Sequence, residues 1–334
     1  MLNIFANNAF SEVSLTAAVN EMPYVPGRIG SMGLFAESGI TTTVVAIENI
    51  RGTLRLVPTT PRGGVGVQHT PDKRSMRNLS TVHIQVDDRV MAEEVQNVRE
   101  FGQESRLQTV QSVVNTRFGF MFRNIDATIE HLYLGAIKGQ LLDADGSTMI
   151  YNLFTEFGVS ALADVDFVLG TSTTNIKSLC NSVVRGIADR LGAAPAGGVY
   201  ALCGDTFYDK ISTHAATKEA YLRFQESAFL REGAAVYDRF PFGGIMFENY
   251  RGSVNGTPFI AADECRFFPA GVGGLFQNWY APGDYMASVN TLGLPRYAKL
   301  IPDLDDKGAA LQAQSNPLPI CTIPAVLRRG FTSN

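Results

Sequence analysis

Glycine, arginine and proline gather in the stretch TTPRGGVGVQHT, residues 59–70, and a glycine-rich loop of this kind could hold a phosphate. A phosphate-binding loop follows a strand and opens directly onto a helix, whose first N–H groups face the anion. Here a polar stretch and then a second strand-like segment, 80–88, follow the glycines, and the sequence contains no GxxxxGK[ST] motif. The sequence therefore favours a solvent-facing hairpin tip over a nucleotide site.

Other residues with chemical potential also lack the spacing that their chemistry needs. No histidine lies in an HExxH motif or at metal-ligand spacing from another ligand, and no two cysteines form a CxxC motif. The segment DLDDKG at 303–308 places Lys307 and Gln314 where a calcium loop needs acidic residues. We therefore predict no catalytic, cofactor-binding or metal-binding residues and no enzymatic activity, and we expect Cys180, Cys203, Cys265 and Cys321 to be reduced core thiols.

The bulk composition limits the class of protein further. The chain has 334 residues, of which 45% are apolar and 18% charged, so it can bury a sizeable core. Its net charge of −4 argues against a protein whose main task is gripping nucleic acid. The sequence has no signal-peptide pattern and no run of about 18 apolar residues, so we expect no association with a membrane.

Two segments with alternating polarity lie on either side of the glycine stretch. Residues 41–58 and 80–88 each place apolar side chains at every second position, which is typical of strands. We predict that they pair as a long antiparallel hairpin, joined by a connection of residues 58–79 that is far longer than most hairpin loops.

The hairpin region is strongly basic. Between residues 51 and 77 the cations outnumber the single acid, Asp72, and the region has no aromatic residue on which a base could stack. An acidic surface on another copy of this protein is the partner that this charge favours. The predicted cationic contact residues are Arg51, Arg55, Arg62, Lys73, Arg74 and Arg77.

An isolated two-stranded hairpin is marginally stable in water, so its apolar face must be covered. Covering it would contribute on the order of 1.5–3 kcal/mol for each large side chain. If the hairpin projects from the body, a neighbouring copy supplies the cover, and head-to-tail contacts of this kind build rings or lattices. The predicted apolar contact residues are Ile50, Leu54, Leu56, Val82, Ile84 and Val86.

A long helix follows the hairpin. The sequence from Asp88 to Gly139 is predicted to be helical, with Asp87 or Asp88 as the N-cap, and from Leu107 onward apolar residues recur every three or four positions. The part from 104 to 138 alone would be about 52 Å long. The polar residues Arg123, Asp126 and Glu130 interrupt its most apolar stretch.

The rest of the chain predicts a mixed α/β module and an extended tail. We expect a hairpin over 140–152 with a type I′ turn at Asp145–Gly146 and an extended segment at 164–170. In 171–294 we expect a helix with a Ser or Thr cap, a central strand at 198–203, a helix capped by Asp205 and a hairpin turning at Asn255–Gly256. The tail, residues 307–330, is extended and interrupted by prolines, which suits an edge strand. Residues 1–36 suit an N-terminal arm.

This order of elements resembles the lambda-like family of tailed-bacteriophage major capsid (major head) proteins, which have the HK97-like fold. The resemblance covers nearly the whole chain. It is clearest in FPFGGIMFENYRGSVNGTPFIAADECRFFPAG, residues 240–271, and in PAVLRRG, residues 324–330. The implied fold class is α+β, an HK97-like capsid fold with an N-terminal arm (1–36), an extended β-hairpin loop (37–90), a peripheral domain with a long spine helix (91–170 and 295–334) and an α/β axial domain (171–294).

The resemblance implies a structural role. It implies a major capsid protein whose hexamers and pentamers form the icosahedral head of the virion, assembled in the host bacterial cytoplasm. The implied partners are further copies of the chain, a scaffolding protein and a portal protein, with a decoration protein left open, around double-stranded DNA that is not bound by sequence. Two alternatives remain at this point: an encapsulin-like compartment shell with a protein cargo, and an unrelated α/β enzyme acting on a small ligand.

Overall fold

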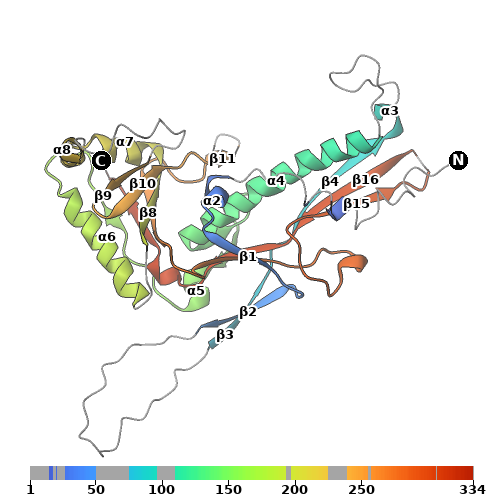
Figure 1. Ribbon diagram of the computed structural model, residues 1–334, viewed down its shortest axis with the longest axis horizontal. Helices are drawn as coiled ribbons and strands as arrows, with labels where there is room; N and C mark the ends of the chain where they lie inside the picture. The colour runs from blue at the N-terminus through green and yellow to red at the C-terminus, as the bar shows by residue number, and fades with distance from the viewer. Residues whose placement is uncertain are drawn as a thin grey trace, which may run out of the picture. The chain divides into compact units, whose positions relative to one another are not determined.

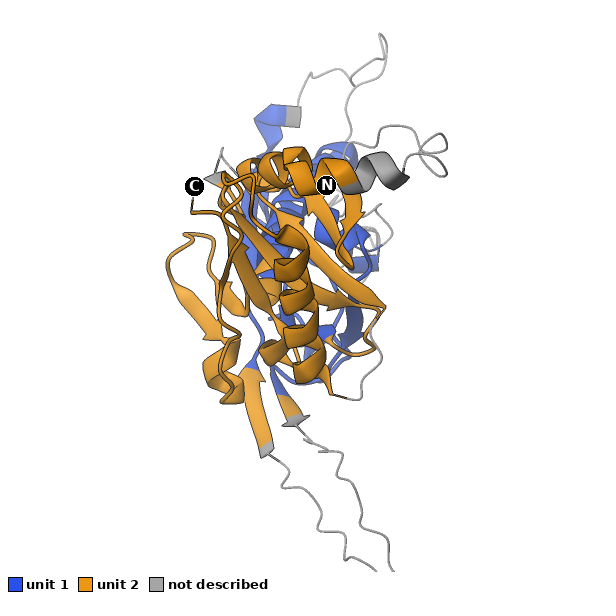
Figure 2. Ribbon diagram, turned by 90° about the vertical axis from the view of Figure 1, so that its left-hand side faces the viewer, with its two compact units in different colours: residues 1–45, 80–133, 276–320 blue, residues 46–79, 134–275, 321–334 orange. Residues whose placement is uncertain are grey.

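The computed structural model describes residues 15–17, 20, 27–49, 75–95, 110–192, 197–224, 239–254, 257–305 and 307–333. The described residues form both helices and β-sheets, so the fold is α+β (Figure 1). The chain divides into two compact units, which Figure 2 shows in different colours. Unit 1 comprises residues 1–45, 80–133 and 276–320, and unit 2 comprises residues 46–79, 134–275 and 321–334.

Two three-stranded sheets form unit 1. The first has the order β15 (Tyr297–Pro302), β16 (Gly308–Ser315), β4 (Ile84–Met91), and both of its strand pairs are antiparallel. The second has the order β1 (Phe35–Gly39), β14 (Phe276–Tyr280), β17 (Pro317–Cys321), with β1 parallel to β14. Unit 1 also contains the short helical segments α2 (Arg28–Ser31), α3 (Ala92–Val95) and η3 (Met286–Ser288).

The pairing predicted between segments 41–58 and 80–88 is wrong in register and partner. Strand β2 (Val44–Asn49) pairs instead with β3 (Ser75–Ser80), a strand that the sequence pattern did not reveal. Residues 84–91 form the separate strand β4, which pairs with β16 of the same chain, so that Ile84 lies opposite Ser315. Asp87 and Asp88 therefore lie inside a strand, and the next helix begins only at Ala92.

The long helix is α4 (Val110–Lys138), and its residues pass from unit 1 to unit 2 after Tyr133. Its 29 residues are about 43 Å long at 1.5 Å each. The predicted stripe is buried at Val114, Phe118, Ile125 and Ile129, and Gly139 ends the helix with a φ of +77°, as its position predicted. Residues 96–109 of the predicted helix lie outside the described residues.

A mixed six-stranded sheet forms the centre of unit 2. Its strand order is β7 (Val165–Asp166), β18 (Arg328–Phe331), β13 (Glu264–Ala270), β8 (Gly198–Cys203), β10 (Ile245–Asn249), β9 (Arg239–Phe242). The segment GVYALC is a central strand, as predicted, parallel to β10 and antiparallel to β13. Strands β7 and β18 lie outside the predicted 171–294 module, so this sheet takes strands from more of the chain than that module contains.

Helices α6 (Ile176–Leu191), α7 (Asp205–Thr213) and α8 (Ala215–Phe224) also belong to unit 2. Both α6 and α7 contact strand β13 of the sheet. The sequence spaces the apolar residues of α6 as a helical stripe. Of these residues, Ile176, Val183 and Ile187 are buried, and Leu179 and Leu191 are half-buried. Phe167 contacts the rings of Phe207 and Phe267, at centroid distances of 5.4 and 5.7 Å, and together they join α7 to the sheet.

The remaining elements of unit 2 are short. They are β5 (Gln140–Leu142), β6 (Met149–Asn152), α5 (Leu153–Phe157), β11 (Ser253–Val254), β12 (Thr257–Pro258) and η4 (Pro324–Val326). Strands β5 and β6 form the predicted hairpin. The predicted turn residues Asn255 and Gly256 lie outside the described residues. The strands on either side of them, β11 and β12, pair as a short hairpin. This hairpin does not extend to β10 and β13, because β8 lies between those two strands in the sheet.

Several local predictions need correction. The N-cap of α6 is Asn175, whose side chain accepts from Ser178 N at 3.1 Å, rather than a Ser or Thr. Helix α7 is preceded by Gly204, and Asp205 is its first residue. The tail is not confined to sheet edges, since β16 lies between β15 and β4 and β18 lies between β7 and β13.

Candidate functional site

The predicted contact residues fall into two groups. Four lie among the described residues: Arg77, Val82, Ile84 and Val86. The others lie outside the described residues: Ile50, Arg51, Leu54, Arg55, Leu56, Arg62, Lys73 and Arg74. The structure therefore places only the downstream end of the predicted surface.

Arg77 is the last residue of the basic segment 51–77 and lies in strand β3. Its guanidinium lies over the ring of Phe157, 5.9 Å from the centroid, and Phe157 is a buried residue at the end of α5. This cation–π contact ties β3 to α5 within unit 2. The side chain of Arg77 is half-buried, so its predicted contact with a second copy stays a prediction for the part that remains exposed.

The apolar residues of the second predicted strand contact the C-terminal part of their own chain. Val82 N donates to Pro317 O at 3.0 Å, and Val86 lies opposite Ala313 in the β4–β16 pair. Val82, Ile84 and Val86 are each half-buried. A neighbouring copy could therefore cover only the exposed remainder of this face.

Polar side chains in and next to β4 also bind neighbouring segments of the same chain. His83 Nδ1 lies 2.7 Å from Asn316 Oδ1, and Gln314 Nε2 donates to Gln85 Oε1 at 2.9 Å. Arg117 of α4 binds Asp88 at 3.0 Å and Glu94 at 2.6 Å. The hydrogen bond to Asp88 raises the pKa of Arg117. Strand β4 is thus fixed to both α4 and β16 within unit 1.

Two acids that interrupt the apolar stretch of α4 are buried. Glu130 is 6% exposed, and its carboxylate accepts from Ile29 N at 2.7 Å and Gly30 N at 3.1 Å. Asp126 binds Arg296 at 2.8 Å, and both side chains are buried. Burial raises the pKa of Asp126, against the attraction of Arg296.

These contacts link the N-terminal segment, which the sequence suggested is only an arm, to the long helix. The carboxylate of Glu130 satisfies the first N–H groups of α2 and thereby attaches this segment to α4. The only signal in the sequence was the acid itself, which interrupts the most apolar stretch of the helix.

A second charged cluster lies in unit 2. Glu264 accepts from Arg266 at 2.8 Å and from Arg329, which also binds Asp164 at 2.8 Å. Burial raises the pKa of Glu264, but the arginines outweigh it and the pKa is below its usual value. Nearby Lys138 Nζ donates to Phe259 O at 2.5 Å, and burial lowers the pKa of Lys138 to about 8. The ion pairs join β13 to β18, and Lys138 links the end of α4 to the segment between β12 (Thr257–Pro258) and β13.

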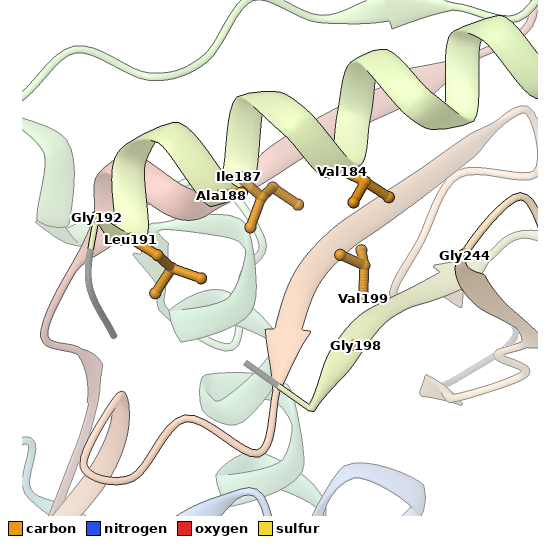
Figure 3. A pocket seen from close by; sticks show the side chains of 8 residues that line it. All are labelled: Val184, Ile187, Ala188, Leu191, Gly192, Gly198, Val199 and Gly244. Atoms are coloured by element: carbon orange, nitrogen blue, oxygen red, sulfur yellow. The ribbon is translucent and has the colours of Figure 1, made fainter. Parts of the chain in front are cut away.

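An apolar cavity of about 280 Å³ lies beside α6 in unit 2 (Figure 3). The side chains of Val184, Ile187 and Leu191 point into it from the helix, and Val199 points into it from β8. Ala188 and three glycines, Gly192, Gly198 and Gly244, complete its lining. The lining carries no ionisable side chain.

The cysteines have the environment that the sequence predicted. Cys180, Cys203, Cys265 and Cys321 are all buried and free. Among the described residues, no group of three or more His, Cys, Asp and Glu side chains could hold a metal ion. No helix in the described part of the chain is long and apolar enough to cross a membrane.

Comparison with known proteins gives a match along almost the entire chain. The family model described as phage major capsid protein E matches residues 11–332. The chain belongs to this family. The match confirms the resemblance drawn from the order of elements and from residues 240–271 and 324–330.

Two relatives of this family member are major capsid proteins. The protein of Pseudomonas phage KPP10 is 27% identical, covering 97% of each chain. The protein of Salmonella phage Felix O1 is 25% identical, covering 98% of this chain and 97% of the relative. A structural match has the same fold: the capsid asymmetric unit of cyanophage A-1(L) has a TM-score of 0.54, 11% identity, and coverage of 94% of this chain and 95% of that one. The fold is the HK97-like capsid fold, as predicted.

Proposed function

We propose that this chain is the major capsid protein of a tailed bacteriophage, and that its hexamers and pentamers form the icosahedral head around double-stranded DNA. The observation that carries the proposal is the family match over residues 11–332. The family is one of structural proteins, which favours a shell over the alternative of a small-ligand enzyme.

The proposed division of labour follows the HK97-like fold. Residues 37–90 act as the extended loop, 91–170 with 295–334 as the peripheral domain, 171–294 as the axial domain and 1–36 as the N-terminal arm. The long helix α4 supports the peripheral assignment, and the central strand β8 with α6 and α7 supports the axial one.

Further partners belong to the same proposal. The head would form in the host bacterial cytoplasm with a separate scaffolding protein and a portal protein, and it would reside in the virion. The net charge of −4 supports a shell that encloses DNA without adhering to it, since like charges keep the two apart.

Electron microscopy of the purified, assembled protein tests the proposal. We expect closed shells of megadalton mass, with DNA inside particles from infected cells. A compact dimer in sedimentation experiments would contradict a shell. Shells that hold an enzyme and no DNA would favour the encapsulin-like alternative.

A further inference from the structure

Two of the four buried cysteines lie directly opposite each other in the six-stranded sheet of unit 2. Cys203 is the last residue of β8, Cys265 is the second residue of β13, and the register of this antiparallel pair matches one with the other. Residues that lie directly opposite each other point to the same face of a sheet. The two thiols therefore emerge side by side, and both side chains are fully buried. Cys180 and Cys321 lie elsewhere, in α6 and β17.

The backbone hydrogen bonds show which class of antiparallel pair the two cysteines form. Gly204 N donates to Glu264 O at 2.9 Å, so the pair one step further along the strands is hydrogen-bonded. Hydrogen-bonded and non-hydrogen-bonded pairs alternate along antiparallel strands, so Cys203 and Cys265 form a non-hydrogen-bonded pair. Pro269, which has no N–H to donate to β8, lies at an equivalent position of β13 in the same alternation.

A non-hydrogen-bonded pair has the backbone spacing that a disulfide needs. Its Cα atoms lie about 4.5 Å apart, and disulfides join Cα atoms that are about 4.4–6.8 Å apart. On the other side of Cys265 lies Gly330 of β18, where a Cβ atom would be 3.2 Å from Cys265 Sγ, so the glycine leaves this sulfur its space. A bond between the two sulfurs therefore needs no large movement of either strand.

We propose that Cys203 and Cys265 form a redox-sensitive modification site, a thiol pair under reducing conditions and a cross-strand disulfide under oxidising ones. The oxidant is a small-molecule disulfide, such as oxidised glutathione. One protein thiolate attacks it and releases a first small thiolate, and the second protein thiolate then attacks the mixed disulfide and releases the other. In all, the two protein thiols lose two protons and two electrons, and the oxidant becomes two thiols.

The disulfide would cross-link unit 2 internally. It would close the chain between residues 203 and 265, which includes α7, α8, β9 and β10, and would thereby restrict the unfolded chain. Burial raises the pKa of the Cys265 thiol, and its interaction with Cys203 raises the pKa further. Because the thiolate is the reactive form, the closed sheet reacts slowly and oxidation follows local opening of the strands. The reaction needs only one copy of the chain, so it does not depend on the proposed function.

Refolding in a mildly oxidising glutathione buffer tests the site, because every thiol meets the oxidant before the sheet closes. The reduced full chain is unfolded in urea, diluted into the buffer and alkylated once it has folded, and peptide mass spectrometry identifies the paired cysteines. A random chain favours the pairing of Cys180 with Cys203, which closes the shortest loop. We expect the native geometry to make the Cys203–Cys265 disulfide more abundant than any other pair by about tenfold or more.

Two outcomes of the refolding experiment would overturn the inference. One is a Cys180–Cys203 disulfide that is as abundant as the Cys203–Cys265 disulfide, which would show that chain length rather than the sheet selects the pair. The other is a folded chain that keeps all four thiols reduced in the oxidising buffer.

Matched variants connect the disulfide with stability. In the wild type, oxidation should raise the urea midpoint of unfolding by about 1 M. Cys321→Ala keeps both thiols of the site and should show the same shift, whereas Cys265→Ala should show none. An equal shift in Cys265→Ala, or an oxidised wild type with an unchanged midpoint, would contradict a cross-link at this site.

Discussion

At the scale of single residues, the carboxylate of Glu130 fixes the position of helix α2 in unit 1. Glu130 stands on the buried face of α4 and accepts hydrogen bonds from two backbone N–H groups of α2. A Cβ atom at Gly27 would lie 2.2 Å from the Glu130 side chain, so the two positions fit each other closely. The sequence could not reveal this fit, because Glu130 and Gly27 are far apart along the chain.

We predict that Glu130→Gln destabilises the subunit by about 1.5–3 kcal/mol. The amide keeps the size of the side chain but replaces an acceptor oxygen by a donor that faces a backbone N–H group. Denaturant unfolding of the free subunit measures the change. The control is Asp189→Asn at an exposed position of α6, which should change the free energy of unfolding by less than about 0.5 kcal/mol. Equal stability of both variants would rule out the proposed role of Glu130.

We predict that Lys138 makes stability rise with pH between about 8 and 10. The pKa of Lys138 is about 8 in the folded chain, below the value of about 10.4 in an unfolded one. The folded state therefore releases this proton first, and the free energy of unfolding increases as pH rises between the two values, by at most about 3 kcal/mol.

The comparison with Lys138→Met isolates this effect. The variant loses the charge and its burial cost, so the rise between pH 8 and 10 should be smaller than in the wild type. Thermal melting of both proteins across this range provides the measurement. Parallel curves for the two proteins would contradict a buried, charged Lys138 near neutral pH.

At the scale of elements, glycines set where helices and hairpins end. Gly139 has a φ of +77°, and a Cβ there would lie 2.4 Å from the ring of Phe154. Gly146 has a similar φ of +69° but no atom near the position of a Cβ. A comparison of substitutions at these two glycines therefore separates the cost of backbone strain from the cost of a steric clash.

We predict that Gly139→Ala costs more stability than Gly146→Ala. Both variants force alanine into the left-handed region, at about 1–2 kcal/mol, and only Gly139→Ala adds an overlap worth about 1–3 kcal/mol. Denaturant unfolding of the two variants gives the difference directly. A larger loss for Gly146→Ala would show that the end of α4 adapts to the methyl group.

The sequence predicted elements better than it predicted their partners. The apolar spacing of α4 and α6 identified their buried faces, because a helix carries its period within one segment. The partner of β4 is β16, more than two hundred residues away, and nothing within residues 80–88 specifies that choice. The alternation showed only that a strand forms.

Hydrogen bonds between a side chain and the backbone explain a smaller error, the predicted length of the turn between β5 and β6. The turn at Asp145–Gly146 is longer than the two-residue turn that the sequence predicted, because the Asp145 carboxylate accepts from both Ser147 N and Thr148 N. Aspartate can cap its own loop in this way, which a simple Asp-Gly rule does not anticipate. These hydrogen bonds also lower the pKa of Asp145, the bond from the Thr148 hydroxyl most of all.

At the scale of the whole molecule, the predicted contact surface depends on residues both inside and outside the described ranges. The described part is fixed to its own chain through Arg77 and β4. The family match gives the reason to expect that the rest serves assembly, and the identity of each contact stays a prediction.

We predict that the double variant Arg51→Glu with Arg55→Glu folds but fails to close particles. Reversing these charges would replace attraction to an acidic copy by repulsion. Electron microscopy and sedimentation report assembly, and circular dichroism reports folding. The matched control is Lys177→Glu with Arg185→Glu, which reverses two exposed cations of α6. Normal particles from Arg51→Glu with Arg55→Glu would count against a charged role for the segment.

The position of β18 has a consequence for biosynthesis. This strand comes after every other strand of its sheet in sequence, yet it lies between β7 and β13. A ribosome makes the chain from its N-terminal side, so β7 lacks its neighbour until residue 331 has emerged. Unit 2 is therefore complete only after residues 328–331 have been made, and nascent chains without them would lack the finished surface that a growing shell could recruit.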